Sequence, residues 1–164
     1  MASYHFLSVW VLDAPLEKVW QAIVDYDRLP VWWKAVAEVR QLQAGDDSGV
    51  GTIWYMKWKT PLSYTLAFEL RTTQVDAPTL LELTAVGEVE GTGRWELVAA
   101  PEGTLVKYFW NVRTTKAWMN LLAAFVRPLL QWNHNAVMRQ GAEGLAQFLG
   151  ARLLKAEAVD PSLP

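Results

Sequence analysis

A chain of 164 residues, 52% of them hydrophobic and 20% charged, is long enough to bury a core and too apolar to be disordered. The net charge of −2 gives no electrostatic reason to expect a nucleic acid partner, and the absence of cysteine excludes disulfides, thiolate metal sites and cysteine nucleophiles. The N-terminus lacks the features of a signal peptide, and the longest apolar runs are too short to span a bilayer. We therefore expect a cytoplasmic protein without stable membrane insertion.

The start of the chain predicts a strand followed by two short helices. Residues 4–12 are rich in aromatic and β-branched types, which is typical of a strand. Asp13 is suited to cap a helix, and apolar residues recur at helical spacing over residues 16–24. We expect Pro30 to end this helix, because proline lacks a backbone donor, and a short second helical turn to follow through residues 32–33.

From residue 35 to residue 115 apolar and polar residues alternate, which is the two-residue period of strands. Counted with the first strand, these segments predict seven strands joined by short turns, without intervening helices. Such an arrangement favours one antiparallel sheet. The six later strands are expected at residues 35–43, 52–59, 62–75, 80–90, 91–99 and 105–115.

The last third of the chain predicts one long helix, over residues 116–155. Pro128 removes a backbone donor, so we expect it to interrupt this helix, with a kink near Phe125. No linker is long enough to divide the chain. We expect a single domain over residues 1–155 and a frayed tail over residues 156–164.

Three segments carry a resemblance to a known superfamily: "APLEKVWQAIVDYDRLPVWW", "GTGRWELV" and "TTKAWMNLLAAFVRPLLQWNHNAVMRQGAEGL". They resemble bacterial, polyketide cyclase-like members of the START-like (SRPBCC) superfamily over roughly residues 5–153. The resemblance implies an α+β helix-grip fold, in which a curved antiparallel seven-stranded sheet wraps around a long C-terminal helix, with two short helices after the first strand. It also implies an apolar cavity between sheet and helix. It implies no particular reaction, because the superfamily includes lipid carriers, hormone receptors and a minority of enzymes.

Ten tryptophans are many for a chain of this length, and alternation places several on one face of the sheet. The opposite faces carry charges of both signs, which predict cross-strand ion pairs. A one-layer sheet with this much indole facing one helix favours a lined cavity over a filled core. The candidate ligand-binding residues are Trp33, Trp54, Met56, Trp58, Tyr64, Leu66, Phe68, Trp95, Tyr108, Trp110, Phe125, Leu130, Asn133, His134, Val137 and Gly141.

The polar stretch within the last helix needs a separate interpretation. At about 100° per residue, Asn133 and His134 fall inside the apolar arc that faces the sheet. Asn135 falls on the opposite side and Trp132 on a flank, where we expect it to pack under a neighbouring element. Three interpretations of the inward pair stay open: bonds to strand groups or water, a polar anchor for a ligand, or catalysis with His134 as a general base.

Two glycines on the covering face of the helix, Gly141 and Gly144, weaken it relative to alanine. Either the helix approaches the sheet closely there, or side-chain volume is withheld to leave room for a guest. "GTGR" is not followed by a helix N-terminus and is no phosphate loop. We find no metal-ligand spacing and expect no metal and no cofactor.

These features favour a protein that binds a hydrophobic small molecule of the lipid, polyketide-like or isoprenoid class, and non-enzymatic binding is preferred over catalysis. The first alternative is a polyketide cyclase or dehydratase, in which His134 with Asn133, or with Tyr64 or Tyr108, would move protons. The second is a module that contacts a partner protein or a membrane. The sequence indicates no oligomeric state.

Overall fold

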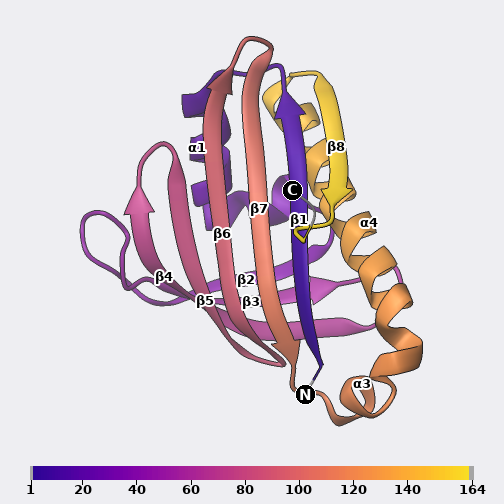
Figure 1. Cartoon of the computed structure of the whole chain (residues 1–164). Coiled ribbons are helices and arrows are strands. Elements are labelled where there is room, and N and C mark those ends of the chain that lie inside the picture. The colour runs from indigo at the N-terminus through magenta and orange to yellow at the C-terminus, as the bar shows by residue number, and fades with distance from the viewer. Residues whose placement is uncertain (1, 163–164) are drawn as a thin grey trace.

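One curved antiparallel sheet and the helices on its concave side make up the computed structural model, which describes residues 2–162 (Figure 1). The strand order is β2-β3-β4-β5-β6-β7-β1-β8. In Figure 1, β2 and β3 run across the direction of β6 and β7, which makes the curvature of the sheet plain. The strands are β1 (Ser3–Leu12), β2 (Val36–Gln43), β3 (Ile53–Lys59), β4 (Thr65–Asp76), β5 (Leu80–Gly87), β6 (Val89–Ala100), β7 (Gly103–Thr114) and β8 (Leu153–Val159).

The expected α+β helix-grip fold is confirmed, with one strand more than predicted. Two helices and one 3-10 turn follow β1, and the long helix is preceded by a short one. The helical elements are α1 (Leu16–Val24), η1 (Tyr26–Arg28), α2 (Leu29–Trp32), α3 (Ala117–Leu121) and α4 (Ala123–Leu149). The expected role of Pro30 is wrong: α1 already ends at Val24, and Pro30 occupies the first turn of α2, where its missing donor costs no helical bond.

The C-terminal helix is interrupted at Leu122, not at Pro128. Leu122 separates α3 from α4 and has a non-helical backbone, with φ −100° and ψ 12°. Pro128 lies inside α4, which continues through it. Proline removes only its own bond to the carbonyl four residues earlier, and the rest of the helix keeps its hydrogen bonds.

The end of the chain also differs from the expectation. α4 ends at Leu149 rather than Lys155, because Gly150 adopts a left-handed conformation (φ 65°) that ends the helix. The chain then returns as β8, antiparallel to β1 (Figure 1). A frayed tail over residues 156–164 is therefore wrong for residues 156–159, which belong to β8; residues 163–164 lie outside the described part of the chain.

The two faces of the sheet differ as their alternation predicts. On the outer face Arg94 of β6 bonds Glu82 of β5 at 2.6 Å, and Arg113 of β7 bonds Glu90 of β6 at 2.8 Å, which confirms the expected cross-strand pairs. The inner face and the helices bury the core, in which Trp10 of β1 and Leu145 of α4 are almost fully enclosed. Among residues 2–162, no helix is both long and apolar enough to cross a bilayer.

Candidate functional site

A cavity of about 130 Å³ lies between the inner face of the sheet and the helices α2, α3 and α4. Strands β3 to β7 supply one wall and α4 supplies the other. The rest comes from β1, the segment from α1 to Trp33, the loop before β4 and Met119 of α3. Its lining contains no Asp, Glu, Lys or Arg among the residues that the structure describes. The cavity is therefore a predominantly apolar site with a few neutral polar groups.

Stacked and edge-on aromatic rings form much of this lining. Trp95 of β6 lies opposite Tyr108 of β7, and their rings stack with centroids 4.1 Å apart. Trp33, which follows α2, meets Trp58 of β3 edge-on at 4.9 Å and Trp95 at 6.3 Å. Because large rings pack through edges and offset faces, they leave a rigid wall rather than a deformable one.

Trp33 also fixes the helix that closes the cavity. Its indole Nε1 donates a 2.9 Å hydrogen bond to the backbone carbonyl of Val137 in α4. A Cβ at Gly141, one turn further along α4, would collide with the same indole. A Cβ at Gly144 would collide with the backbone carbonyl of Trp32. Close packing therefore explains both glycines, but the neighbours are Trp32 and Trp33 and not the sheet, and neither glycine leaves room for a guest.

Asn133 is buried, with 3% of its surface exposed, and its amide bonds to the protein at both ends. The side-chain oxygen accepts a 3.3 Å bond from the backbone N–H of Leu62, and the amide nitrogen donates at 3.1 Å to the Tyr64 hydroxyl. The amide thereby ties α4 to the loop before β4. Of the interpretations that the sequence left open, bonding within the protein describes Asn133, and both of its partners lie in the loop before β4 and not on a strand.

His134 lies in the lining against β1. Its imidazole stacks on Phe6 with centroids 3.9 Å apart and an interplanar angle of 11°. Nδ1 is buried and has no hydrogen-bond partner within the described part of the chain. Burial lowers the pKa of His134 to about 4, against a weaker opposing effect of the Asn135 side chain. The ring is therefore neutral near pH 7 and a weak proton acceptor.

Three tyrosines of the cavity, Tyr26, Tyr64 and Tyr108, are held as phenols. Burial raises the pKa of Tyr108 well above its ordinary value, and it raises that of Tyr26 as well. Burial also raises the pKa of Tyr64, partly opposed by hydrogen bonds that include the one with Asn133. Among residues 2–162, no cluster of three or more His, Asp or Glu side chains has the arrangement of a metal site.

Thirteen of the sixteen residues predicted from the sequence line this cavity, and three do not: Trp54, Phe125 and Gly141. Trp54 is buried outside the lining, edge-on to Tyr26 at 5.4 Å. Gly141 lies under the Trp33 indole. Phe125 is 85% exposed near the start of α4. Seven helical steps of about 100° put Phe125 on the side of Trp132, away from the cavity.

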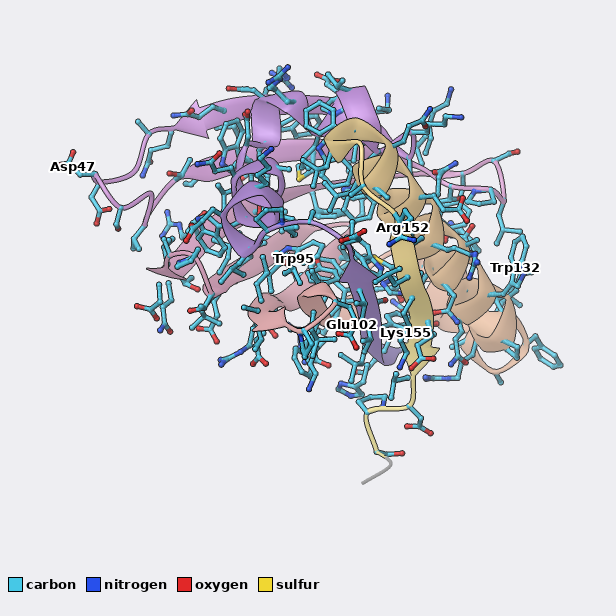
Figure 2. The ribbon with its side chains drawn as sticks, turned by 90° about the horizontal axis from the view of Figure 1, so that it is seen from above. Asp47, Trp95, Glu102, Trp132, Arg152 and Lys155 are labelled. Atoms are coloured by element: carbon cyan, nitrogen blue, oxygen red, sulfur yellow. The ribbon has the colours of Figure 1, made fainter. Side chains whose placement is uncertain are left out.

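Trp132 does not pack under a neighbouring element as expected, because 55% of its surface is exposed. Figure 2 shows Trp132 on the outer side of α4, whereas Trp95 lies towards the middle of the molecule. One helical projection thus accounts for both results: Asn133 and His134 point inward, as predicted, and Trp132 points outward.

Several lining residues were not predicted. Tyr4 and Phe6 come from β1, and Tyr26, Leu29 and Trp32 come from η1 and α2. The two-residue alternation of Tyr4, Phe6 and Trp10 was sufficient to predict which residues of β1 face the cavity, because alternate residues of a strand share a face. The short helical segment offered no comparable signal, since so few residues define no periodic face.

A family model described as polyketide cyclase/dehydrase and lipid transport matches residues 7–156. An aromatase/cyclase, ZhuI from Streptomyces sp. R1128, superposes with a TM-score of 0.75 at 13% identity, covering 91% of this chain and 94% of that one. A conserved protein from Geobacillus kaustophilus gives 0.74 at 13% identity, covering 96% and 100%. A protein from Thermus thermophilus gives 0.69 at 17% identity, covering 90% and 99%. No match to a curated protein was found.

Proposed function

The chain belongs to the polyketide cyclase/dehydrase and lipid transport family, and we propose that its cavity binds a small hydrophobic molecule. The observation that carries this proposal is the lining itself, which is aromatic and aliphatic and has no charged side chain among the described residues. Transfer of apolar surface from water into such a lining contributes about 25 cal/mol per Å², before the costs of association.

The size of the cavity favours a compact ligand. An apolar cavity of about 150 Å³ accommodates benzene, and the present cavity measures about 130 Å³. Of the lipid, polyketide-like and isoprenoid classes, a molecule with one ring matches this volume, and a second ring requires lining side chains to shift. A long acyl chain would require the helices to move away from the sheet.

A titration tests ligand binding directly. A panel of apolar aromatic and isoprenoid compounds is added to the protein, and the melting temperature and tryptophan fluorescence are recorded. A ligand at about 100 times its Kd stabilises the folded state by about 2.7 kcal/mol, a rise of several degrees for a chain of this size. A broad panel that produces neither a shift nor quenching contradicts the proposal.

A matched pair of variants locates the site. Val137→Phe adds volume to the lining, and Val86→Phe makes the same change at an exposed position on β5. We expect Val137→Phe to remove ligand-induced stabilisation and Val86→Phe to retain it. Circular dichroism of both variants verifies that they are folded. Equal binding by both would place the ligand outside the cavity.

A cyclase or dehydratase activity is the second candidate, supported by His134 in the lining and by the fold shared with the ZhuI aromatase/cyclase. In this case the cavity would orient a substrate, and neutral His134 would accept a proton at Nδ1. Replacement of His134 by Ala distinguishes the candidates. Turnover of a polyketide-like substrate would collapse in an enzyme, whereas a binding protein would retain most of its affinity.

A further inference from the structure

Five buried side-chain polar atoms lack a hydrogen-bond partner in the described part of the chain, and all five belong to residues that line the cavity. These atoms are Tyr4 Oη, Tyr26 Oη, Trp32 Nε1, Trp58 Nε1 and His134 Nδ1. Buried polar groups in folded proteins are nearly always bonded. These atoms have almost no accessible surface, so an occupant would reach them only after small shifts of the lining side chains. Concentration of the exceptions around one cavity is the ground for inferring that its occupant supplies the missing partners.

Other polar groups of the same lining serve as internal comparisons. Trp33 lies between Trp32 and Trp58, and its Nε1 bonds the Val137 carbonyl at 2.9 Å. Tyr64 likewise accepts a bond from Asn133. The protein itself therefore provides hydrogen-bond partners for one indole and one phenol of this cavity, Trp33 and Tyr64, whose bonds hold α4 in place. Trp32 and Trp58 are the indoles whose fully buried Nε1 has no acceptor among residues 2–162.

The chemistry of these atoms restricts the occupant. An indole Nε1–H can only donate, so Trp32 and Trp58 require acceptor atoms. The two hydroxyls and the imidazole can donate or accept, according to rotamer and tautomer. No cation lines the cavity within the described chain, so an ionised carboxylate would be buried without a partner.

We propose that the cavity binds a compact, uncharged, largely aromatic molecule whose oxygen acceptors bond the indole N–H groups of Trp32 and Trp58. This inference rests on the proposed function. It specifies carbonyl, hydroxyl or ether oxygens on the ligand and excludes free fatty acids. It further assigns to Trp32 and Trp58 the preference of the cavity for an oxygenated ring compound over a plain hydrocarbon.

The test compares three probes of similar size: naphthalene, 1-tetralone, which carries one carbonyl on a partly saturated ring, and 1-naphthoate, which carries a negative charge. Affinities are measured by calorimetry at pH 7. One hydrogen bond of ordinary strength gives roughly a fivefold preference for 1-tetralone over naphthalene. We expect that preference, together with no measurable binding of 1-naphthoate.

Three single variants assign the preference to the indoles. Trp32→Phe and Trp58→Phe each remove an N–H but keep an aromatic ring, and Trp132→Phe makes the same change on the outer side of α4. The ratio of the 1-tetralone and naphthalene affinities should fall towards one in at least one cavity variant and stay unchanged in Trp132→Phe. Retained naphthalene affinity verifies that the cavity of each variant is intact.

The outcomes separate this inference from the proposed function. Equal affinities for naphthalene and 1-tetralone, unaltered by Trp32→Phe and Trp58→Phe, would overturn the inference and indicate that only water meets these atoms. Ligand binding itself would stand in that case. Binding of 1-naphthoate as tight as that of 1-tetralone would overturn the requirement for a neutral ligand. Absence of binding by every probe and by the wider panel would overturn both.

Discussion

The His134 imidazole lies almost parallel to the Phe6 ring, with centroids 3.9 Å apart and planes inclined by 11°. This stack joins the middle of α4 to β1 and buries Nδ1 at the same time. Phe6 in turn stacks on Tyr4 at 5.9 Å, so three rings form a continuous aromatic surface at one side of the cavity. At neutral pH His134 therefore contributes an uncharged aromatic ring to that surface.

Acidification should destabilise the protein through His134. The folded state holds its pKa at about 4, against an ordinary value of 6.5. Between these values the unfolded chain binds more protons than the folded one, so stability falls as the pH is lowered from 7 towards 4. At pH 5 the loss is about 2 kcal/mol. Urea unfolding at pH 7 and pH 5 measures it.

Two variants identify the group responsible for this pH effect. His134→Phe keeps a ring against Phe6 and should abolish the contribution of His134 to the difference between pH 7 and pH 5. His5→Gln removes the other histidine, which is exposed on β1, and should leave the effect of His134 in place. An unchanged pH dependence in His134→Phe would contradict the assignment.

Replacement of Asn133 by Leu should weaken the fold. The variant keeps most of the side-chain volume but leaves the Leu62 N–H and the Tyr64 hydroxyl without their bonds to Asn133. An unsatisfied buried group costs about 1–3 kcal/mol, which should appear as a lower urea midpoint. Gln131→Leu, at an exposed position of α4, is the control and should change stability by less than about 0.5 kcal/mol.

Gly141→Ala should destabilise a helix that alanine normally strengthens. In an open helix the change would contribute about 1 kcal/mol of stability. Here the new Cβ collides with the Trp33 indole, and overpacking of this kind costs about 1–3 kcal/mol. A double-mutant cycle with Trp33→Phe measures the coupling. A stabilising Gly141→Ala would show that Trp33 can move aside.

Truncation should cost much more stability on the inner side of α4 than on its outer side. Leu130→Ala removes a buried cavity-lining side chain and should cost about 2–5 kcal/mol. Phe125→Ala removes an aromatic ring that is 85% exposed and should cost less than about 0.5 kcal/mol. Thermal unfolding of both variants, with circular dichroism as the signal, compares them directly. A large loss in Phe125→Ala would mean that this ring is covered in solution.

Much of the cavity wall could be predicted because a strand has a strict period. Met56 and Trp58 share a face, and strand alternation assigned them inward without knowledge of the topology. The same alternation cannot say how far along the strand the cavity extends. Trp54 has the correct face but lies beside Tyr26, beyond the lining.

Long-range contacts limited the remaining predictions. The inward direction of Asn133 follows from the helical period, but its partners in residues 62–64 are set by how the loop before β4 meets α4. Segment 153–159 contains good helix formers, so its pairing with β1 was not apparent from local pattern. Trp32 lines the cavity because α2 packs on α4. The periodicity of the sequence does not predict that contact.

The seven residues of β8 also bear on how the molecule behaves at high concentration. β1 has β7 along one edge and β8 along the other, so its backbone is paired on both sides. A chain shortened at Gly150 would keep α4 but leave one edge of β1 open to a strand from a second molecule. The C-terminal strand thus moves the sheet edge from the ten residues of β1 to the shorter, charged β8, and its removal should first appear as a loss of solubility.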